Sequence, residues 1–168
     1  MQAGGPVKRW ALTKQAPHPW PFSHGMVVEG PLRLVFLAGQ VAFDRHGPDR
    51  QLVGRGDPAA QTRQAIENVR NLVRQAGGDL GDVVEMTVYA TDAGLMEAAG
   101  RVAQEYFGEP PPAQSFVVVK ALARPELLLE IRAIAAIPPK PAASRRAAVP
   151  RRAEGRPAGR AAPRRARR

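Results

Sequence analysis

Two apolar segments near residue 130 constrain the architecture more than any other feature of the chain. Residues 115–122 (SFVVVKAL) and 126–137 (ELLLEIRAIAAI) carry apolar side chains at consecutive positions, not only at every second one. Successive side chains of a strand point to opposite faces of a sheet, so strands made of these segments are apolar on both faces. A sheet that contains them has to be covered on both sides.

The rest of the chain supplies helices for one of those sides only. Apolar positions at helical spacing predict helices over residues 58–76 and 94–107, and Asp57 is suited to cap the first of them. Strand patterns surround these helices in the order β-β-α-β-α-β-β. Because two helices can cover one face of such a sheet, we predict an α+β fold with a mixed β-sheet and two helices on one face. A homo-oligomer would bury the other face.

The positive net charge of +10 comes from the C-terminal segment. Residues 138–168 hold 11 of the 25 Lys and Arg residues and one of the 15 Asp and Glu residues, so residues 1–137 hold 14 of each. This segment has almost no large apolar side chain, and we expect a disordered basic tail. Such a tail is either a solvated extension or a weak, salt-dependent arm for nucleic acid. The proline-rich residues 1–24 are expected to be an extended lead-in, which leaves residues 25–137 as the folded domain.

Composition excludes several classes of protein. The chain has no cysteine, so it has neither disulfides nor thiolate metal sites. His18, His24 and His46 lack metal-ligand spacing, and no glycine-rich loop has the residues of a phosphate site. We expect neither a metal nor a cofactor. No stretch approaches the ~20 apolar residues of a membrane span, so we expect a soluble, cytoplasmic protein without a membrane partner.

Four blocks of sequence, in order, resemble the reactive-intermediate deaminase family (RidA, YjgF-type, also called the L-PSP endoribonuclease family). The blocks are GPLRLVFLAGQVAFD, QTRQAIENVRNLVRQAGGDLGDVVEMTVYATD, PPPAQSFVVVKAL and LEIRAIAAI, and the resemblance covers roughly residues 15–137. It implies a chorismate-mutase-like fold and a homotrimer whose sheets form a central barrel, with ligand clefts between subunits. It also implies hydrolysis of imines and enamines without a metal or cofactor.

One position departs from the family's deaminating members. Those members have Pro-Ala-Arg-Ser where this chain has Pro112-Ala113-Gln114-Ser115. A guanidinium can hold the carboxylate of a 2-imino acid through two charge-assisted hydrogen bonds, whereas the amide of Gln114 carries no charge. A hydrogen bond to a charged group contributes ~1.5–3 kcal/mol, so its loss weakens carboxylate binding on the order of tenfold to a hundredfold. Gln114 therefore argues against the family's 2-imino-acid deaminase activity.

The resemblance assigns a catalytic role to Glu130, because this residue aligns with the glutamate that positions the attacking water. The competing interpretation is structural, with Arg132 pairing with Glu130 along the strand or across a subunit contact. Arg132 also departs from the family, where an acidic residue is common. Two hypotheses stay open for it: Arg132 replaces the lost anion-binding group, or it forms an ordinary ion pair.

Four further residues are candidates for substrate binding, each with a structural alternative. Gly39 could present backbone groups to a ligand or mark a strand bulge. Ser115 could bind a ligand or the backbone. Met96 could line the pocket, although its helical spacing favours the core, and Phe22 could form a wall of the pocket.

The sequence therefore predicts a homotrimer with a small-molecule cleft between subunits. The expected reaction is hydrolysis of an imine or enamine metabolite other than a standard 2-imino acid. Two alternatives remain: a trimer that binds a metabolite without turnover, and a protein that contacts nucleic acid through the basic tail.

Overall fold

The computed structural model of the chain describes residues 6–12, 22–44 and 51–139. Nine elements follow one another in these ranges: β1 (Lys8–Leu12), β2 (Gly25–Glu29), β3 (Arg33–Gln40), α1 (Pro58–Gln75), the 3-10 helix η1 (Leu80–Asp82), β4 (Val83–Ala90), α2 (Leu95–Tyr106), β5 (Ala113–Val118) and β6 (Leu129–Ile137). No helix of this part of the chain is long and apolar enough to cross a membrane.

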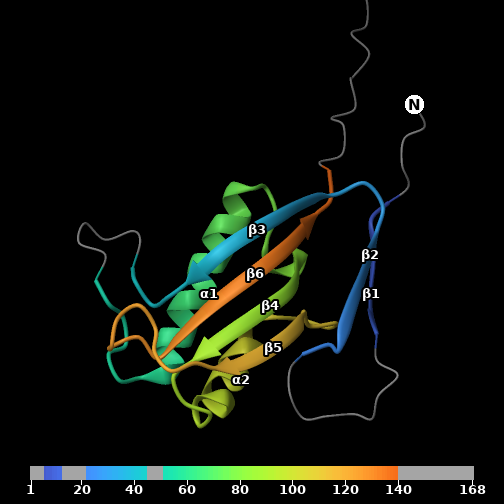
Figure 1. Cartoon of the computed structure of the whole chain (residues 1–168). Coiled ribbons are helices and arrows are strands. Elements are labelled where there is room, and N and C mark those ends of the chain that lie inside the picture. The colour runs from blue at the N-terminus through green and yellow to red at the C-terminus, as the bar shows by residue number, and fades with distance from the viewer. Residues whose placement is uncertain (1–5, 13–21, 45–50, 140–168) are drawn as a thin grey trace, which may run out of the picture.

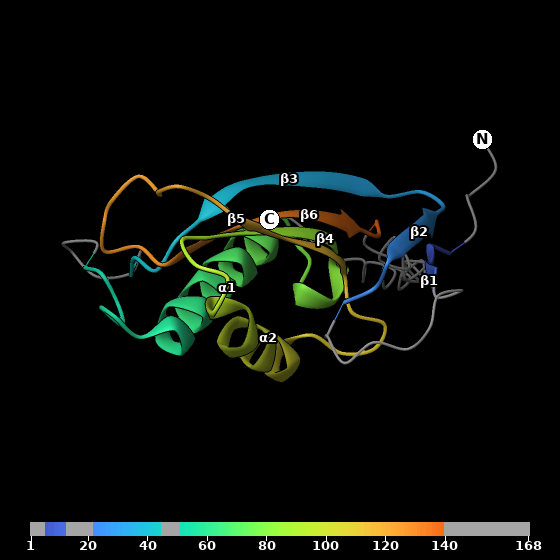
Figure 2. The same ribbon diagram turned by 60° about the horizontal axis from the view of Figure 1, so that its bottom comes forward.

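The main sheet has four strands in the order β3-β6-β4-β5 (Figure 1). The β3–β6 and β6–β4 pairs are antiparallel, whereas the β4–β5 pair is parallel. Both helices lie on the same side of this sheet (Figure 2). The predicted α+β class, with a mixed sheet and two helices on one face, is thus confirmed. The trimeric barrel stays a prediction, because the structure contains a single chain.

A separate two-stranded sheet, β1–β2, stands beside the main sheet (Figure 1). Its first strand lies in the segment for which we expected an extended lead-in, and Lys8 to Leu12 pair in register with Glu29 to Gly25. The prolines that suggested an extended lead-in fall in residues 13–21, outside the described residues. The tail lies outside them from residue 140 onward.

Helix α1 forms where the sequence predicts it and for the predicted reasons. Asp57 is the N-cap, and its carboxylate accepts a hydrogen bond from the Ala60 N–H at 3.0 Å. Pro58 occupies the first helical position, where its missing N–H costs nothing. The helix ends at Gln75, and Gly77 takes the left-handed conformation (φ 86°) that a C-terminal turn requires.

The core lies between the sheet and the helices. Side chains at alternating positions of the inner strands fill it, and α1 adds the apolar residues of one face. Its members include Ile66, Val69, Val73, Met86, Val88, Leu129, Ile131 and Ala133.

Helix α1 also presents buried amides that fix the loop leading into β6. The Gln61 amide nitrogen donates to the carbonyl of Gly54 (3.2 Å) and to that of Glu126 (2.9 Å). The Gln61 amide oxygen accepts from the N–H of Leu128 at 2.9 Å. Gln61 is fully buried with both of its polar atoms satisfied, and it therefore sets where β6 begins.

Candidate functional site

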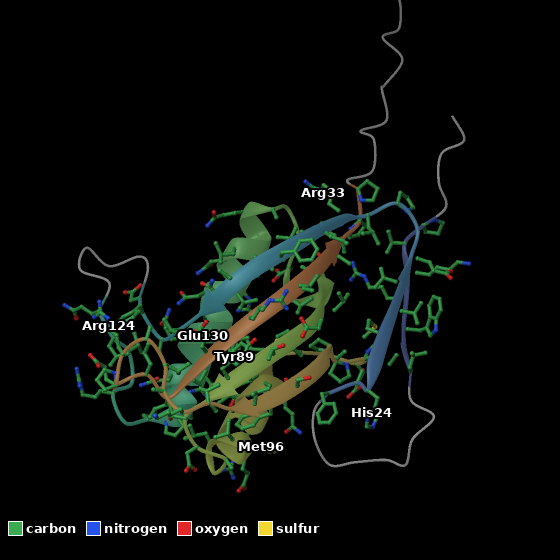
Figure 3. All side chains as sticks on the ribbon, viewed as in Figure 1. His24, Arg33, Tyr89, Met96, Arg124 and Glu130 are labelled. Atoms are coloured by element: carbon green, nitrogen blue, oxygen red, sulfur yellow. The ribbon has the colours of Figure 1, made fainter. Side chains whose placement is uncertain are left out.

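The face of the main sheet away from the helices carries one continuous group of polar side chains. Across the β4–β6 ladder, Tyr89 pairs with Glu130 and Thr87 pairs with Arg132. Thr87 also pairs with Ser115 of β5. Residues paired in a ladder point to the same face, so these five side chains share the uncovered face. Figure 3 shows Glu130 and Tyr89 beside one another on their neighbouring strands.

Gly39 makes room for the Glu130 side chain on this face. The β3–β6 register shifts between Leu37 and Gln40, which is the bulge that a glycine in the strand suggested. A Cβ built on Gly39 would lie 2.7 Å from Cγ of Glu130 and would overlap its carboxylate. Glycine at position 39 therefore lets the Glu130 carboxylate lie against the backbone of β3. The structure brings these two predicted site residues together.

The carboxylate of Glu130 is half-buried and unpaired. Within residues 6–12, 22–44 and 51–139 it has no hydrogen-bond or ion-pair partner, and neither does the hydroxyl of Tyr89. A carboxylate on such a strand has a strong tendency to acquire a partner when its surface is covered. Glu130 is thus the one acidic group of this face that is free to act on a ligand.

Within one chain Arg132 does not pair with Glu130 along the strand, whereas pairing across a subunit contact stays a prediction. Its guanidinium lies 3.4 Å from the carboxylate of Glu85 on β4. The hydroxyl of Thr87 donates to the other oxygen of the same carboxylate at 2.9 Å. Thr87 stands directly opposite Arg132 in the ladder and so aims Glu85 at the guanidinium. Arg132 forms an ordinary ion pair in this chain, as the simpler of the two hypotheses predicted.

Gln114 and Met96 lie on the opposite face, between the sheet and the helices. Gln114 pairs with the buried Met86, so its side chain points toward the helices. A cavity of about 20 Å³ lies there, and it is lined mainly by apolar side chains, among them Met96 of α2 and Phe116 of β5. The amide oxygen of Gln114 is buried and has no partner among the described residues. Within one chain, therefore, Gln114 and Glu130 do not belong to one site.

Phe22 precedes β2 in the chain and lies beside the start of β5. Its neighbour Ser23 is hydrogen-bonded to the residues that lead into β5. The Ser23 N–H donates to the carbonyl of Pro112 at 3.0 Å, and the Ser23 hydroxyl donates to that of Pro111 at 2.6 Å. The ring of Phe22 packs edge-on against His24, with 5.6 Å between the ring centroids. Phe22 is thus held close to the end of β5 that carries Gln114. The sequence analysis did not identify Ser23, which has the common appearance of a loop serine.

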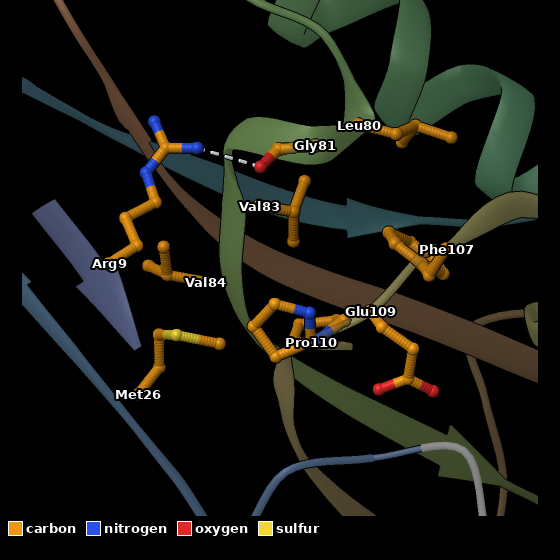
Figure 4. A pocket seen from close by; sticks show the side chains of 11 residues that line it. Arg9, Met26, Leu80, Gly81, Val83, Val84, Phe107, Glu109 and Pro110 are labelled. Atoms are coloured by element: carbon orange, nitrogen blue, oxygen red, sulfur yellow. Dashed lines mark hydrogen bonds between the residues drawn. The ribbon is translucent and has the colours of Figure 1, made fainter. Parts of the chain in front are cut away.

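A second cavity lies between the β1–β2 sheet and the end of α2 (Figure 4). Its volume is about 240 Å³. Arg9 borders it, and its guanidinium donates to the carbonyl of Gly81 (2.8 Å), to the carboxylate of Asp82 (2.6 Å) and to the carbonyl of Ala136. The terminal nitrogens of Arg9 are thus already engaged, and Arg9 serves to hold β1 on the body of the fold.

The chain matches proteins of one family over most of its length. The family model Endoribonuclease L-PSP matches residues 13–137. A RutC family protein of Pyrococcus abyssi is 36% identical over 130 residues, which are 77% of this chain and 97% of that protein. The chain belongs to this family, the RidA/YjgF or Rid family.

Solved structures of Rid proteins have the same fold. The Rid family protein YyfB of Yersinia pestis is similar with a TM-score of 0.65 and 36% identity, covering 77% of this chain and 98% of that one. RidA of an Antarctic Psychrobacter is similar with a TM-score of 0.58 and 31% identity, covering 76% and 98%. The family and the fold that the sequence resemblance predicted are both confirmed.

Proposed function

We propose that this chain forms a homotrimer through the uncovered face of its sheet and hydrolyses an imine or enamine metabolite in a cleft between subunits. The substrate is one without the carboxylate of a 2-imino acid. Glu130 orients the attacking water and moves its proton. Neither a metal nor a cofactor takes part.

The unpaired carboxylate of Glu130 is the observation that carries this proposal. It lies on the face that the helices leave open, against a glycine whose missing side chain makes room for it. Nothing among the described residues neutralises it or holds it in a structural role. A carboxylate in that state is suited to accept a proton from water.

An exposed apolar area of the sheet supports assembly through the open face. Leu34 and Phe36 of β3 are 55% and 66% exposed, although they belong to a strand inside a folded domain. Paired with Ala136 and Ile134 of β6, they form an apolar area beside the polar group. A second copy packed there would remove this area from water at a gain of about 25 cal/mol per Å².

The opposite placement of Gln114 and Glu130 also favours a cleft between copies. Side chains on the two opposite faces of a sheet cannot line the same cavity within one chain. A site that uses Glu130 together with the β5 position 114 therefore needs the open face of one copy and the β5 edge of the next. Phe22, held at the same end of β5, would then belong to the Gln114 half of the cleft.

The reaction needs only water and one carboxylate that accepts and returns a proton. Water adds through its oxygen to the carbon of the C=N bond. Its proton passes to Glu130, and the electron pair of the C=N bond moves to the nitrogen, which is already protonated. Glu130 gives this proton to the nitrogen of the resulting carbinolamine, which makes it an ammonium leaving group. The C–N bond then breaks and the C=O bond forms, and the hydroxyl proton passes through Glu130 to the released amine, so the carboxylate of Glu130 is restored.

Activity toward two substrates tests this proposal. One is a 2-imino acid made in situ by an amino-acid oxidase, and the other is the matching imine without a carboxylate, made by an amine oxidase. We expect wild type to hydrolyse only the second and Gln114→Arg to gain the first, whereas Glu130→Gln should hydrolyse the second on the order of a hundredfold more slowly than wild type. Hydrolysis of the 2-imino acid by wild type at the rate of Gln114→Arg would contradict the role given to position 114.

A trimer that binds a metabolite without turnover is the second candidate function. It is favoured by the burial of Gln114 against apolar side chains, which leaves that half of the cleft without a reactive group. This candidate predicts that neither wild type nor Gln114→Arg hydrolyses either imine. Ligand binding to wild type would then be retained.

A further inference from the structure

We infer that the ligand of this cleft carries a positive charge on nitrogen, as a protonated imine or an ammonium group next to a small apolar body. The inference rests on the proposed function, because it uses the cleft in which Glu130 faces the ligand. It adds the ligand's charge, which family membership does not give.

The first step is the charge of the open face. Its charged strand residues are Glu85, Glu130 and Arg132, two carboxylates and one guanidinium, which leave a net charge of −1. A ligand covered by this face and by a second copy loses much of its water. It then experiences that charge at a lower effective dielectric constant, where like charges repel more strongly.

The second step is that, among the residues that the structure describes, no cation of this face is free for an anionic ligand. Arg132 lies against Glu85, whose second oxygen is held by the Thr87 hydroxyl. To bind a carboxylate, Arg132 would have to exchange this partner for another of the same charge. The exchange gains little and leaves Glu85 unpaired. The surplus negative charge therefore stays with Glu130.

The third step is that position 114 contributes no cation. Gln114 carries no charge, and the cavity that it borders is lined only by uncharged side chains. An arginine at position 114 would offset the net charge of −1 on the open face and would suit a carboxylate. With Gln114 that negative charge is not offset, so a carboxylate is disfavoured and a cation is favoured.

The fourth step is the aromatic ring beside the carboxylate. Tyr89 is the direct ladder partner of Glu130, and its hydroxyl has no partner among the described residues. A carboxylate next to an aromatic ring is a common arrangement for binding ammonium-type nitrogen, because the ring face attracts a cation. Tyr89 is thus a further binding residue of the site, which the alternation of residues 83–90 could have identified.

The positive charge of the ligand also indicates which class of reaction supplies the substrate. A cationic imine without a carboxylate arises when an amine loses two electrons and two protons to an oxidant and the imine nitrogen then takes up a proton. Oxidation of an amino acid would instead leave the carboxylate in place. We therefore assign the substrate to the products of amine oxidation.

Binding of three small probes to the full-length protein tests the charge directly. Isobutylammonium, isobutyramide and isobutyrate share one apolar body and differ in charge. By calorimetry or ligand-observed NMR at pH 7, we expect the ammonium ion to bind on the order of tenfold tighter than the amide, and isobutyrate to bind weakest. Equal or tighter binding of isobutyrate would overturn the inference.

Two substitutions that each remove one negative charge test where the cation binds. Glu130→Gln should reduce ammonium affinity to that of the amide, whereas Glu85→Gln should reduce it less and should strengthen isobutyrate binding, because it frees Arg132. Tyr89→Leu should weaken ammonium binding several-fold, and Tyr89→Phe should not, because it keeps the ring. Unchanged ammonium affinity in Glu130→Gln, in a variant that elutes and melts as wild type does, contradicts the site.

Binding and turnover separate this inference from the proposed function. If the ammonium ion binds through Glu130 but no imine is hydrolysed, the cation site stands and the hydrolase proposal fails. If the 2-imino acid and the imine without a carboxylate are hydrolysed equally well, the hydrolytic role of Glu130 stands, whereas the charge preference and the role given to position 114 both fail.

Discussion

Two glutamines of this fold differ in how their buried amide groups are hydrogen-bonded. Gln61 is fully buried and uses its amide nitrogen for two carbonyls and its oxygen for a backbone N–H. Gln114 has a buried amide oxygen that no described group satisfies. A buried oxygen without a partner is costly, and a stability-optimised chain would have an apolar residue there. The cost at Gln114 is consistent with a side chain kept for a ligand.

Replacing each of these two glutamines with methionine measures this difference in stability. Gln114→Met keeps the side-chain length and removes the unsatisfied oxygen, so we expect a gain of about 1 kcal/mol in the free energy of unfolding. Gln61→Met should cost about 3 kcal/mol or more, because it leaves the Glu126 carbonyl and the Leu128 N–H without these partners and removes one of the two hydrogen bonds to the Gly54 carbonyl. Thermal melts of the two variants and wild type show whether each substitution stabilises or destabilises the fold. Equal destabilisation by both would show that Gln114 is satisfied in the assembled protein.

At the scale of elements, sequence patterns identified both helices and the four strands of the main sheet. The cap at Asp57 and the glycines after α1 are local signals, and local geometry followed them. What the patterns could not give was pairing between segments far apart in the chain. Strand β1 depends on β2 and on Arg9 reaching Asp82, 73 residues away in sequence.

The same holds for the site: local sequence patterns predicted some of its features, whereas features that depend on strand pairing could not be predicted. Alternation along β6 places Glu130 and Arg132 on one face, and the pattern correctly indicated that this face is uncovered. It could not show that Arg132 pairs with Glu85, because that contact depends on the register of β4 against β6. Nor could it show that Gln114 faces the helices, since that depends on the parallel pairing of β5 with β4.

The short turn between α1 and β4 gives a prediction about pH. The Leu80 N–H bonded to Asp79, and secondarily Arg74 beside it, hold the pKa of the Asp79 carboxyl below its ordinary value, although partial burial opposes this. A carboxyl with a lowered folded-state pKa stabilises the fold above its unfolded pKa and loses that contribution as the pH falls through the folded value. Asp79→Asn should therefore lower the Tm at pH 7, and the difference from wild type should shrink below about pH 4. A difference that is constant from pH 7 to pH 3 would contradict this account.

At the scale of the whole molecule, the open face predicts how the chain assembles. Phe36 is 66% exposed on that face, and Leu12 is 52% exposed on the separate β1–β2 sheet. If the main-sheet face is the contact, Phe36→Glu should convert a trimer into monomers, because it would place a charge without a partner in the interface. Leu12→Glu is the matched control and should leave the trimer intact. Light scattering during gel filtration gives the mass of each variant, and a trimeric Phe36→Glu would exclude this face.

The placement of Gln114 and Glu130 on opposite faces has a consequence for mixtures of chains. In the proposed trimer each cleft would take one of these positions from one subunit and the other from its neighbour, so no single chain would contain a complete site. A chain with both Gln114→Arg and Glu130→Gln lacks the carboxylate in every cleft, and wild type lacks the arginine in every cleft. Co-assembled, the two kinds of chain create clefts that have both groups. Two proteins that are each inactive toward a 2-imino acid should then become active by sharing a trimer, as two defective alleles complement each other in one cell.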